Sequence, residues 1–127
     1  MHKVLIVEDD ANIRRLIRDS LEPAGYDIVE AVKGELGLVV AAQEQPDVLV
    51  LDVMMPGDTD GLEVCRRAKA TPSLAQTKVL MLSARGDAAD LERGAQAGAD
   101  AYLVKPFSPI ELARAVSELL AVQDVAP

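Results

Sequence analysis

The chain has 127 residues, the usual length of one domain, with a hydrophobic fraction of 50% and 27% charged residues, which excludes a disordered or fibrous protein. The formal net charge of −8 argues against direct binding of nucleic acid, because that requires a basic surface. No run reaches the roughly 18 apolar residues of a membrane-spanning helix, and a single cysteine allows no internal disulfide, so we expect a cytoplasmic protein.

Short apolar segments alternate with amphipathic segments along the whole chain. The apolar segments predict parallel strands covered on both faces, at residues 4–8, 27–31, 47–52, 78–83 and 101–105. Apolar residues three or four positions apart predict one helix after each strand, with stripes at Ile13, Leu16, Ile17 and Leu21; Leu36, Val39 and Val40; Leu62, Cys65 and Ala68; Leu91 and Ala95; and Leu112, Val116, Leu119 and Leu120.

The helix boundaries carry their own signals. Asp10 is placed to cap the first helix, and the segments "PAGYD" and "AGAD" and residue Pro46 close three helices before the following strands. Ser108 and Glu111 have the spacing of a capping box, with Pro109 at the first helical position. Five strand–helix units predict an α/β fold with a single doubly wound five-stranded parallel sheet, (βα)5.

Charged and polar residues stand where the predicted strands end, which is where ligands bind in such sheets. Glu8 and Asp9 follow the first strand and Asp52 ends the third. Three carboxylates close together repel by about 4 kcal/mol per pair at 4 Å and an effective dielectric constant of 20, so they require a cation. Oxygen ligands of this kind favour magnesium, with manganese as the alternative.

Two more strand ends supply groups that can bind an anion. Ser83 ends the fourth strand and Lys105 the fifth, so a hydroxyl and an ammonium join the carboxylates. A metal, an ammonium, a hydroxyl and a free carboxylate suit phosphoryl transfer, with Asp52 as the nucleophile that forms an acyl phosphate. Taken singly, each residue has an ordinary explanation as a cap, a loop residue or a surface charge. Their joint placement at four strand ends favours the site.

The segments "VLIVEDD", "VLVLDVMMPG", "VLMLSA" and "ADAYLVKPFSPIEL" occur in the order and spacing that resemble receiver domains of two-component response regulators. The resemblance covers essentially the whole chain and implies a flavodoxin-like fold with strand order 2-1-3-4-5. It also implies a receiver domain over residues 1–121, with residues 122–127 as a C-terminal tail or the start of a linker.

The same resemblance implies roles for individual residues. Asp52 matches the phosphoacceptor, Asp9 a direct magnesium ligand and Glu8 an acid that acts through metal-bound water. Met54 matches the residue whose backbone carbonyl completes the metal shell. The switch and phosphate-binding residues of the family match Ser83, Ala84, Tyr102, Lys105 and Pro106, and the Lys105–Pro106 bond is expected to be cis.

The resemblance further implies a regulator and not an enzyme. It would accept a phosphoryl group from a sensor histidine kinase or a phosphotransfer protein, with the basic residues Arg14, Arg15 and Arg18 near the donor. Phosphorylation would change the conformation of the face formed by the fourth helix, fifth strand and fifth helix. That face would act on an effector protein or an attached output domain. We expect a monomer or a phosphorylation-dependent dimer.

Two departures from the family pattern stand out. The segment "MMPGDTDG" has one residue more between Pro56 and Gly61 than usual, which predicts altered geometry beside Asp52. Leu91 and Ala101 stand where a dimerising subfamily carries charges, although Arg93 and Asp100 remain.

Two other readings use the same residues. A haloacid-dehalogenase-type phosphatase also forms an aspartyl phosphate, but it needs a second Asp two residues after the nucleophile, where this chain has Met54. A receiver-like binding module without switching would have lost some of the acids, Ser83 or Lys105. Dinucleotide binding lacks its Gly-rich turn after the first strand.

Overall fold

The five strands form one parallel sheet. We describe a computed structural model of the chain, which covers residues 2–55 and 59–125. The strands are β1 (Lys3–Val7), β2 (Asp27–Ala31), β3 (Val48–Asp52), β4 (Lys78–Ser83) and β5 (Ala101–Val104), in the order β2-β1-β3-β4-β5. The predicted doubly wound sheet and its strand order are therefore confirmed.

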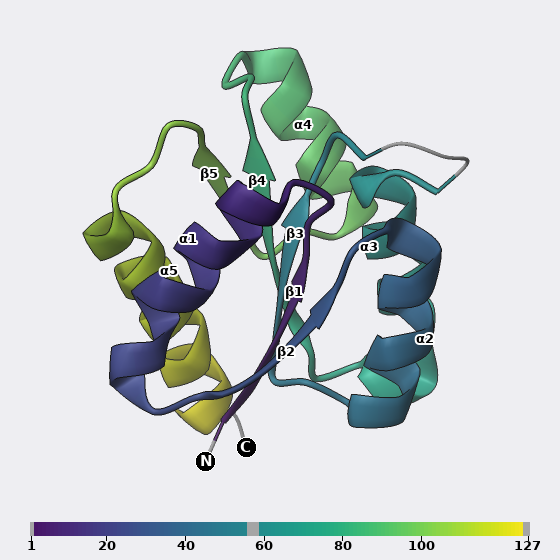
Figure 1. Ribbon diagram of the computed structural model, residues 1–127. Helices are drawn as coiled ribbons and strands as arrows, with labels where there is room; N and C mark the ends of the chain where they lie inside the picture. The colour runs from purple at the N-terminus through teal and green to yellow at the C-terminus, as the bar shows by residue number, and fades with distance from the viewer. Residues whose placement is uncertain (1, 56–58, 126–127) are drawn as a thin grey trace.

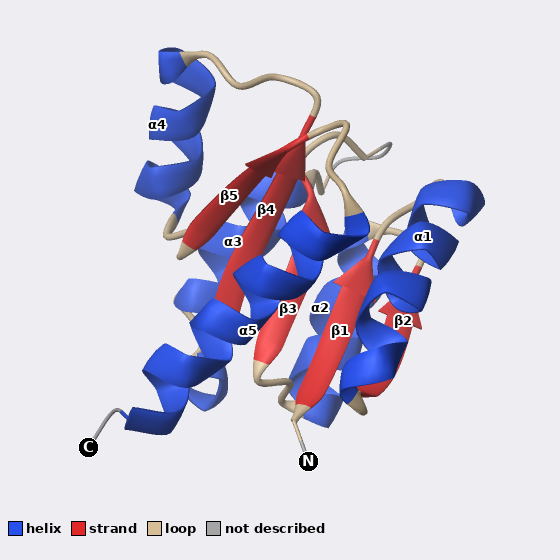
Figure 2. Cartoon of the chain, turned by 90° about the vertical axis from the view of Figure 1, so that its left-hand side faces the viewer, coloured by secondary structure: helices blue, strands red, loops and turns tan. Residues whose placement is uncertain are grey.

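Helices cover both faces of this sheet (Figures 1 and 2). They are α1 (Ala11–Leu21), α2 (Gly34–Glu44), α3 (Gly61–Lys69), α4 (Ala88–Ala97) and α5 (Pro109–Val125), with 3₁₀ turns at Glu22–Ala24 and Pro72–Leu74. Helices α1 and α5 pack on one face and α2, α3 and α4 on the other. This division follows from right-handed crossovers on either side of β1, which the strand order requires.

Alternate residues of each strand fill two separate apolar layers. In β1, Leu5 and Val7 pack toward α2 and α3, whereas Val4 and Ile6 pack toward α1 and α5. All four are fully buried, which explains why the strand sequence is apolar without alternation. Cys65 belongs to the first layer, and burial raises the pKa of its thiol to about 11, so it is a core residue as predicted.

Side-chain caps fix the beginnings of the helices. Asp10 accepts hydrogen bonds from the backbone N–H groups of Asn12 and Ile13, as expected. The capping box before α5 is confirmed in both directions: Ser108 Oγ accepts from the N–H of Glu111 at 3.1 Å, and Glu111 Oε1 accepts from the N–H of Ser108 at 3.2 Å. These caps satisfy N–H groups that a helix start leaves unpaired.

The predicted apolar stripe of α4 is wrong, and that of α2 is right only for Val40, which packs partly buried against the core. The buried residues of α2 are Gly34, Gly37 and Ala41, and Val39 is 54% exposed. The buried residues of α4 are Asp90, Gly94 and Ala97, and Leu91 is exposed. In both helices small residues face the sheet because they allow close approach. Leu38 and Val40 of α2 pack against the same core layer while remaining partly exposed.

The strand boundaries shift by at most one residue from those expected. Glu8 and Lys105 lie just beyond β1 and β5, but their N–H groups still donate to Ala31 O and Ser83 O, at 3.1 and 2.7 Å. Helix α5 continues through Val125, into the segment expected to form a tail. The extra residue expected between Pro56 and Gly61 belongs to a loop of which residues 56–58 lie outside the described part of the chain, so its effect on the geometry beside Asp52 stays a prediction.

Candidate functional site

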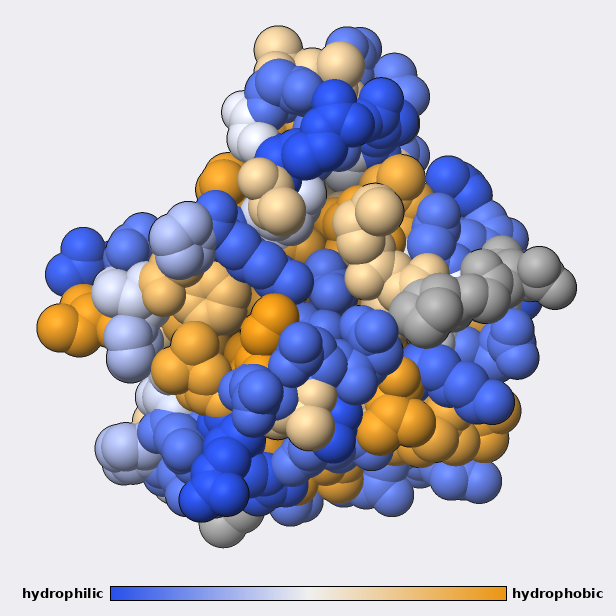
Figure 3. Space-filling view, turned by 45° about the horizontal axis from the view of Figure 1, so that its top comes forward, coloured by the Kyte–Doolittle hydropathy of each residue, from blue (hydrophilic) through white to orange (hydrophobic). Residues whose placement is uncertain are grey.

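Three carboxylates converge at the carboxyl edge of the sheet. Strands β1 and β3 are neighbours with Val7 opposite Leu51, so the residues that follow β1 lie beside Asp52. Glu8, Asp9 and Asp52 each offer an oxygen, and these oxygens all lie within 4.8 Å of one another. Figure 3 shows this edge from above, with hydrophilic surface at its centre between hydrophobic areas.

Burial makes this cluster electrostatically unfavourable by itself. Glu8 is 1% exposed and Asp52 is 5% exposed, whereas Asp9 is exposed. Burial, followed by the neighbouring Asp52 carboxylate, raises the pKa of Glu8 to about 8. Glu8 Oε1 is the single buried side-chain oxygen or nitrogen among the described residues that has no hydrogen-bond partner.

The donor set fits a hard divalent cation. It consists of carboxylate oxygens only, one from each of the three residues, so a cation would neutralise the negative charge that they bring together. Carboxylate oxygens suit hard cations such as magnesium, calcium and manganese.

Lys105 supplies the positive charge that the sequence predicts at this edge. Its Nζ lies 3.2 Å from Asp52 Oδ1 and 3.5 Å from Glu8 Oε1. The Lys105–Pro106 peptide bond is cis, as the resemblance implied. The ammonium is partly exposed, so it faces both the carboxylates and the opening of the site.

The backbone around Asp52 is held tightly by its neighbours. The N–H of Met54 donates to Asp52 Oδ1 at 3.2 Å, and the N–H of Gly61 donates to Val53 O at 3.0 Å. A Cβ atom on Gly61 would lie 2.1 Å from the carbonyl oxygen of Asp52. Only glycine therefore fits at the start of α3.

The hydroxyl groups expected at the phosphate-binding edge are bonded elsewhere. Ser83 is buried, and its Oγ donates to Asp90 Oδ2 at 3.0 Å and accepts from the N–H of Arg85 at 3.1 Å. The single proton of the Tyr102 hydroxyl has two acceptors within reach, Arg85 O at 2.8 Å and Asp90 Oδ2. Both hydroxyls are therefore directed toward α4 and the segment before it.

Sequence reasoning missed Asp90. In the sequence it resembles an acid that stabilises the first turn of a helix, because Asp87 caps that helix three residues earlier. The structure buries it and lowers its pKa through hydrogen bonds, first from Tyr102 and then also from Arg93 and Ser83. The alternation of polar and apolar residues gives no signal of this.

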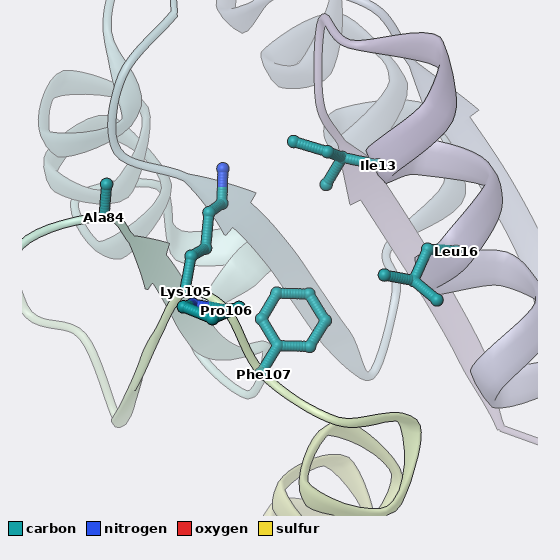
Figure 4. Close-up of a pocket in the computed structure, with 6 residues that line it drawn as sticks. All are labelled: Ile13, Leu16, Ala84, Lys105, Pro106 and Phe107. Atoms are coloured by element: carbon teal, nitrogen blue, oxygen red, sulfur yellow. The ribbon is translucent and has the colours of Figure 1, made fainter.

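An apolar pocket of about 380 Å³ adjoins the charged site. Figure 4 shows the Phe107 ring between Lys105 and the side chains of α1 that line the opposite wall. Its lining residues are Ile13, Leu16, Ala84, Lys105, Pro106 and Phe107. An occupant of this pocket would approach Lys105 from the side of α1.

Most of the charges that the sequence singles out away from the site are paired within the chain. Arg14 and Arg18 both bond to Glu30, so Arg15, with a side chain 82% exposed, is the member of the basic group that projects most into solvent. The two charges expected at a dimer face also have partners: Arg93 pairs with Asp90 and Asp100 with Lys69.

Comparison with known proteins identifies the family. Residues 4–117 match the response regulator receiver domain. The chain is 46% identical over 121 residues to the transcriptional regulatory protein ResD of Bacillus subtilis, with 93% of this chain and 48% of the relative covered. It is 42% identical to the transcriptional regulator RpaA of Synechocystis, with 100% and 52% covered.

Comparison with solved structures gives the same family. The chemotaxis protein CheY4 of Vibrio cholerae superposes with a TM-score of 0.88 at 32% identity, with 94% of this chain and 98% of that one covered. The chain belongs to the receiver domains of two-component response regulators, a family of phosphorylation-activated signalling domains. It spans about half the length of the regulators ResD and RpaA. Within the described residues, no helix combines the length and the apolar character needed to cross a membrane.

Proposed function

We propose that the protein is a switch whose phosphoacceptor is Asp52 and whose phosphorylation depends on magnesium. The observation that carries the proposal is the position of Asp52 between the other carboxylates and an ammonium, with Lys105 Nζ 3.2 Å from its Oδ1. An Asp oxygen attacks the phosphorus of the donor, the bond from phosphorus to the donor nitrogen breaks, and its electron pair stays on that nitrogen.

The cation would be held by Asp9 and Asp52 directly, by Glu8 through water and by the backbone carbonyl of Met54. When bound, it supplies positive charge that offsets the charge on the transferring phosphoryl oxygens. Lys105 contributes a second positive charge from the chain itself. Ala84, exposed beside the pocket, leaves the approach to Asp52 open.

Phosphorylation would then change the arrangement of nearby hydroxyl groups. It adds a charge of roughly −1.5 to −2 and strong acceptor oxygens at Asp52, which favour a bond from Ser83. Shifting a two-state equilibrium from 1:99 to 99:1 takes about 5.5 kcal/mol. A few hydrogen bonds to a charged group, at about 1.5 to 3 kcal/mol each, can supply this. Tyr102 would carry the change to the α4–β5–α5 face.

The partners in this proposal follow from family membership. The donor would be a histidine kinase or a phosphotransfer protein that covers the pocket beside α1. The α4–β5–α5 face would act on an effector or an attached output domain, as a monomer or a phosphorylation-dependent dimer. Residues 1–121 would form the receiver domain, with 122–127 leading out of it. The protein would act in the cytoplasm, as a regulator and not as an enzyme.

Labelling with acetyl phosphate tests the phosphoacceptor. With magnesium present, the wild type is expected to take up one phosphoryl group and Asp52→Ala none above background, because the nucleophilic oxygen is gone. Asp19→Ala is the matched control, since Asp19 is an exposed acid on α1 that pairs with Arg15. Equal labelling of Asp52→Ala and wild type refutes the assignment.

The phosphatase alternative has less support. Met54 occupies the position of the second acid, is 72% exposed and offers only its backbone N–H to Asp52. Sustained turnover of a small phosphate ester would favour that alternative. Failure of the wild type to bind magnesium would favour a receiver-like module that no longer switches.

A further inference from the structure

Asp90, on the first turn of α4, collects three side-chain donors. It is 6% exposed. Its Oδ2 accepts from Ser83 Oγ at 3.0 Å and contacts the Tyr102 hydroxyl, while its Oδ1 accepts from Arg93 Nη2 at 2.9 Å. Its own N–H donates to the capping residue Asp87 at 2.8 Å, which fixes the turn. The carboxylate therefore has a defined position under α4.

The two hydroxyls reach this oxygen from neighbouring strands. Ser83 ends β4, and Tyr102 lies on β5 opposite Met81. The Tyr102 ring packs against α4 so closely that a Cβ atom on Gly94 would lie 3.2 Å from its Cδ2. Ser83 and Tyr102 are thus connected through one carboxylate oxygen.

The Ser83 hydroxyl has a single proton to donate. In this structure Ser83 Oγ donates that proton to Asp90. Its second hydrogen bond is one that it accepts, from the N–H of Arg85. A phosphoryl oxygen on Asp52 that needs the Ser83 proton must therefore compete with the Asp90 carboxylate. Acceptors that carry charge form the stronger hydrogen bonds, so this competition has a measurable cost.

We infer that Asp90 is a positioning residue that competes with the phosphoryl group for the Ser83 hydroxyl and transmits the outcome to Tyr102 through their shared oxygen. The inference rests on the proposed function. The single proton of the Tyr102 hydroxyl can go to Arg85 O or to Asp90 Oδ2. When Ser83 turns to the phosphoryl group, Asp90 Oδ2 loses one of its two hydroxyl contacts and competes better with Arg85 O for the Tyr102 proton. No covalent bond changes, and each proton stays on its own oxygen.

Affinity for beryllofluoride, a mimic of the phosphoryl group, measures the competition. Titration calorimetry in magnesium is expected to show about fivefold tighter binding for Asp90→Ala than for wild type, because the competing acceptor is gone. Asp90→Asn keeps one neutral acceptor oxygen in the same shape, so its affinity should fall between the two. Glu92→Ala, which removes an exposed acid from the same helix, should bind as the wild type does.

The Ser83→Ala background distinguishes a positioning role of Asp90 from a role in the stability of the fold. In Ser83→Ala there is no hydroxyl to compete for, so adding Asp90→Ala should change the affinity by less than about twofold. An equal effect of Asp90→Ala in both backgrounds overturns the inference. Weaker binding by Asp90→Ala, or by Asp90→Asn if the alanine variant does not fold, also overturns it.

The Tyr102 hydroxyl gives a readout that needs no phosphoryl mimic. Burial and the bond to Asp90 raise the pKa of Tyr102. Carbon-13 NMR titration of the ion-free protein should show a lower Tyr102 pKa in Asp90→Asn and a higher one in Ser83→Ala, where Oδ2 serves Tyr102 alone. An unchanged pKa in both variants refutes the shared carboxylate. If wild type fails to bind beryllofluoride, the proposed function fails and this titration alone decides the role of Asp90.

Discussion

Glu8→Gln is expected to unfold at a higher temperature than the wild type at pH 8 in EDTA. The folded protein raises the pKa of Glu8 from 4.5 to about 8, so the folded state holds the proton more tightly than the unfolded chain does. Folding stability from this group is therefore greatest below pH 4.5 and falls as the pH rises toward 8. A glutamine side chain carries no charge, so the variant avoids a cost on the order of 4 kcal/mol, or roughly 15 °C in Tm.

Calorimetric scans from about pH 5 to about pH 9 span the shifted pKa of Glu8 and measure this difference. The gap between the two proteins should be small at the acid end, widen with rising pH, and narrow when magnesium is added to the wild type. Glu92→Gln, a change at an exposed position on α4, serves as the control and should follow the wild type. A variant that is less stable than wild type at pH 8 in EDTA contradicts the claim that the carboxylates repel one another.

Gly61→Ala is expected to lower the free energy of unfolding by about 3 kcal/mol or more, at the upper end of the range for overpacking. The new Cβ would lie 2.1 Å from Asp52 O and 2.7 Å from Val53 Cα. Both are backbone atoms of a buried segment, so neither can move without displacing Asp52 or the start of α3. Urea denaturation measures the loss.

Gly86→Ala provides the matched control for this prediction. There the Cβ would lie 2.8 Å from Cγ2 of Val104, a side chain that is 41% exposed and can turn away. We expect a loss below about 1 kcal/mol for this variant. A Gly61→Ala protein as stable as Gly86→Ala would show that the backbone beside Asp52 adapts more easily than its packing indicates.

The sheet could be predicted from sequence because its strands carry a simple signal. Each is buried on both faces, so runs such as Val48 to Leu51 are apolar throughout, and the helices between them follow from the crossovers of a parallel sheet. The convergence of Glu8, Asp9 and Asp52 followed from the same topology, because all three stand at adjacent strand ends. The strand order itself came from the resemblance to receiver domains.

The features that sequence did not reveal depend on side-chain packing. The fully buried residues of α2 are glycine and alanine, and those of α4 are Asp90, Gly94 and Ala97, so hydrophobicity alone does not locate the buried faces of these helices. Asp90 is buried because Ser83, Tyr102 and Arg93 satisfy it from three different segments. No local sequence pattern indicates that these side chains come together around Asp90. The pocket walled by Phe107 and α1 likewise exists only once α1 and the β5–α5 segment lie side by side.

The most direct measurement is a crystal structure of the protein with magnesium and beryllofluoride. We expect the ion between Asp9 and Asp52, the beryllium on an Asp52 oxygen, and fluorine atoms within hydrogen-bond distance of Lys105 Nζ and Ser83 Oγ. An ion bound away from these carboxylates, or a beryllofluoride group on another residue, would contradict the account.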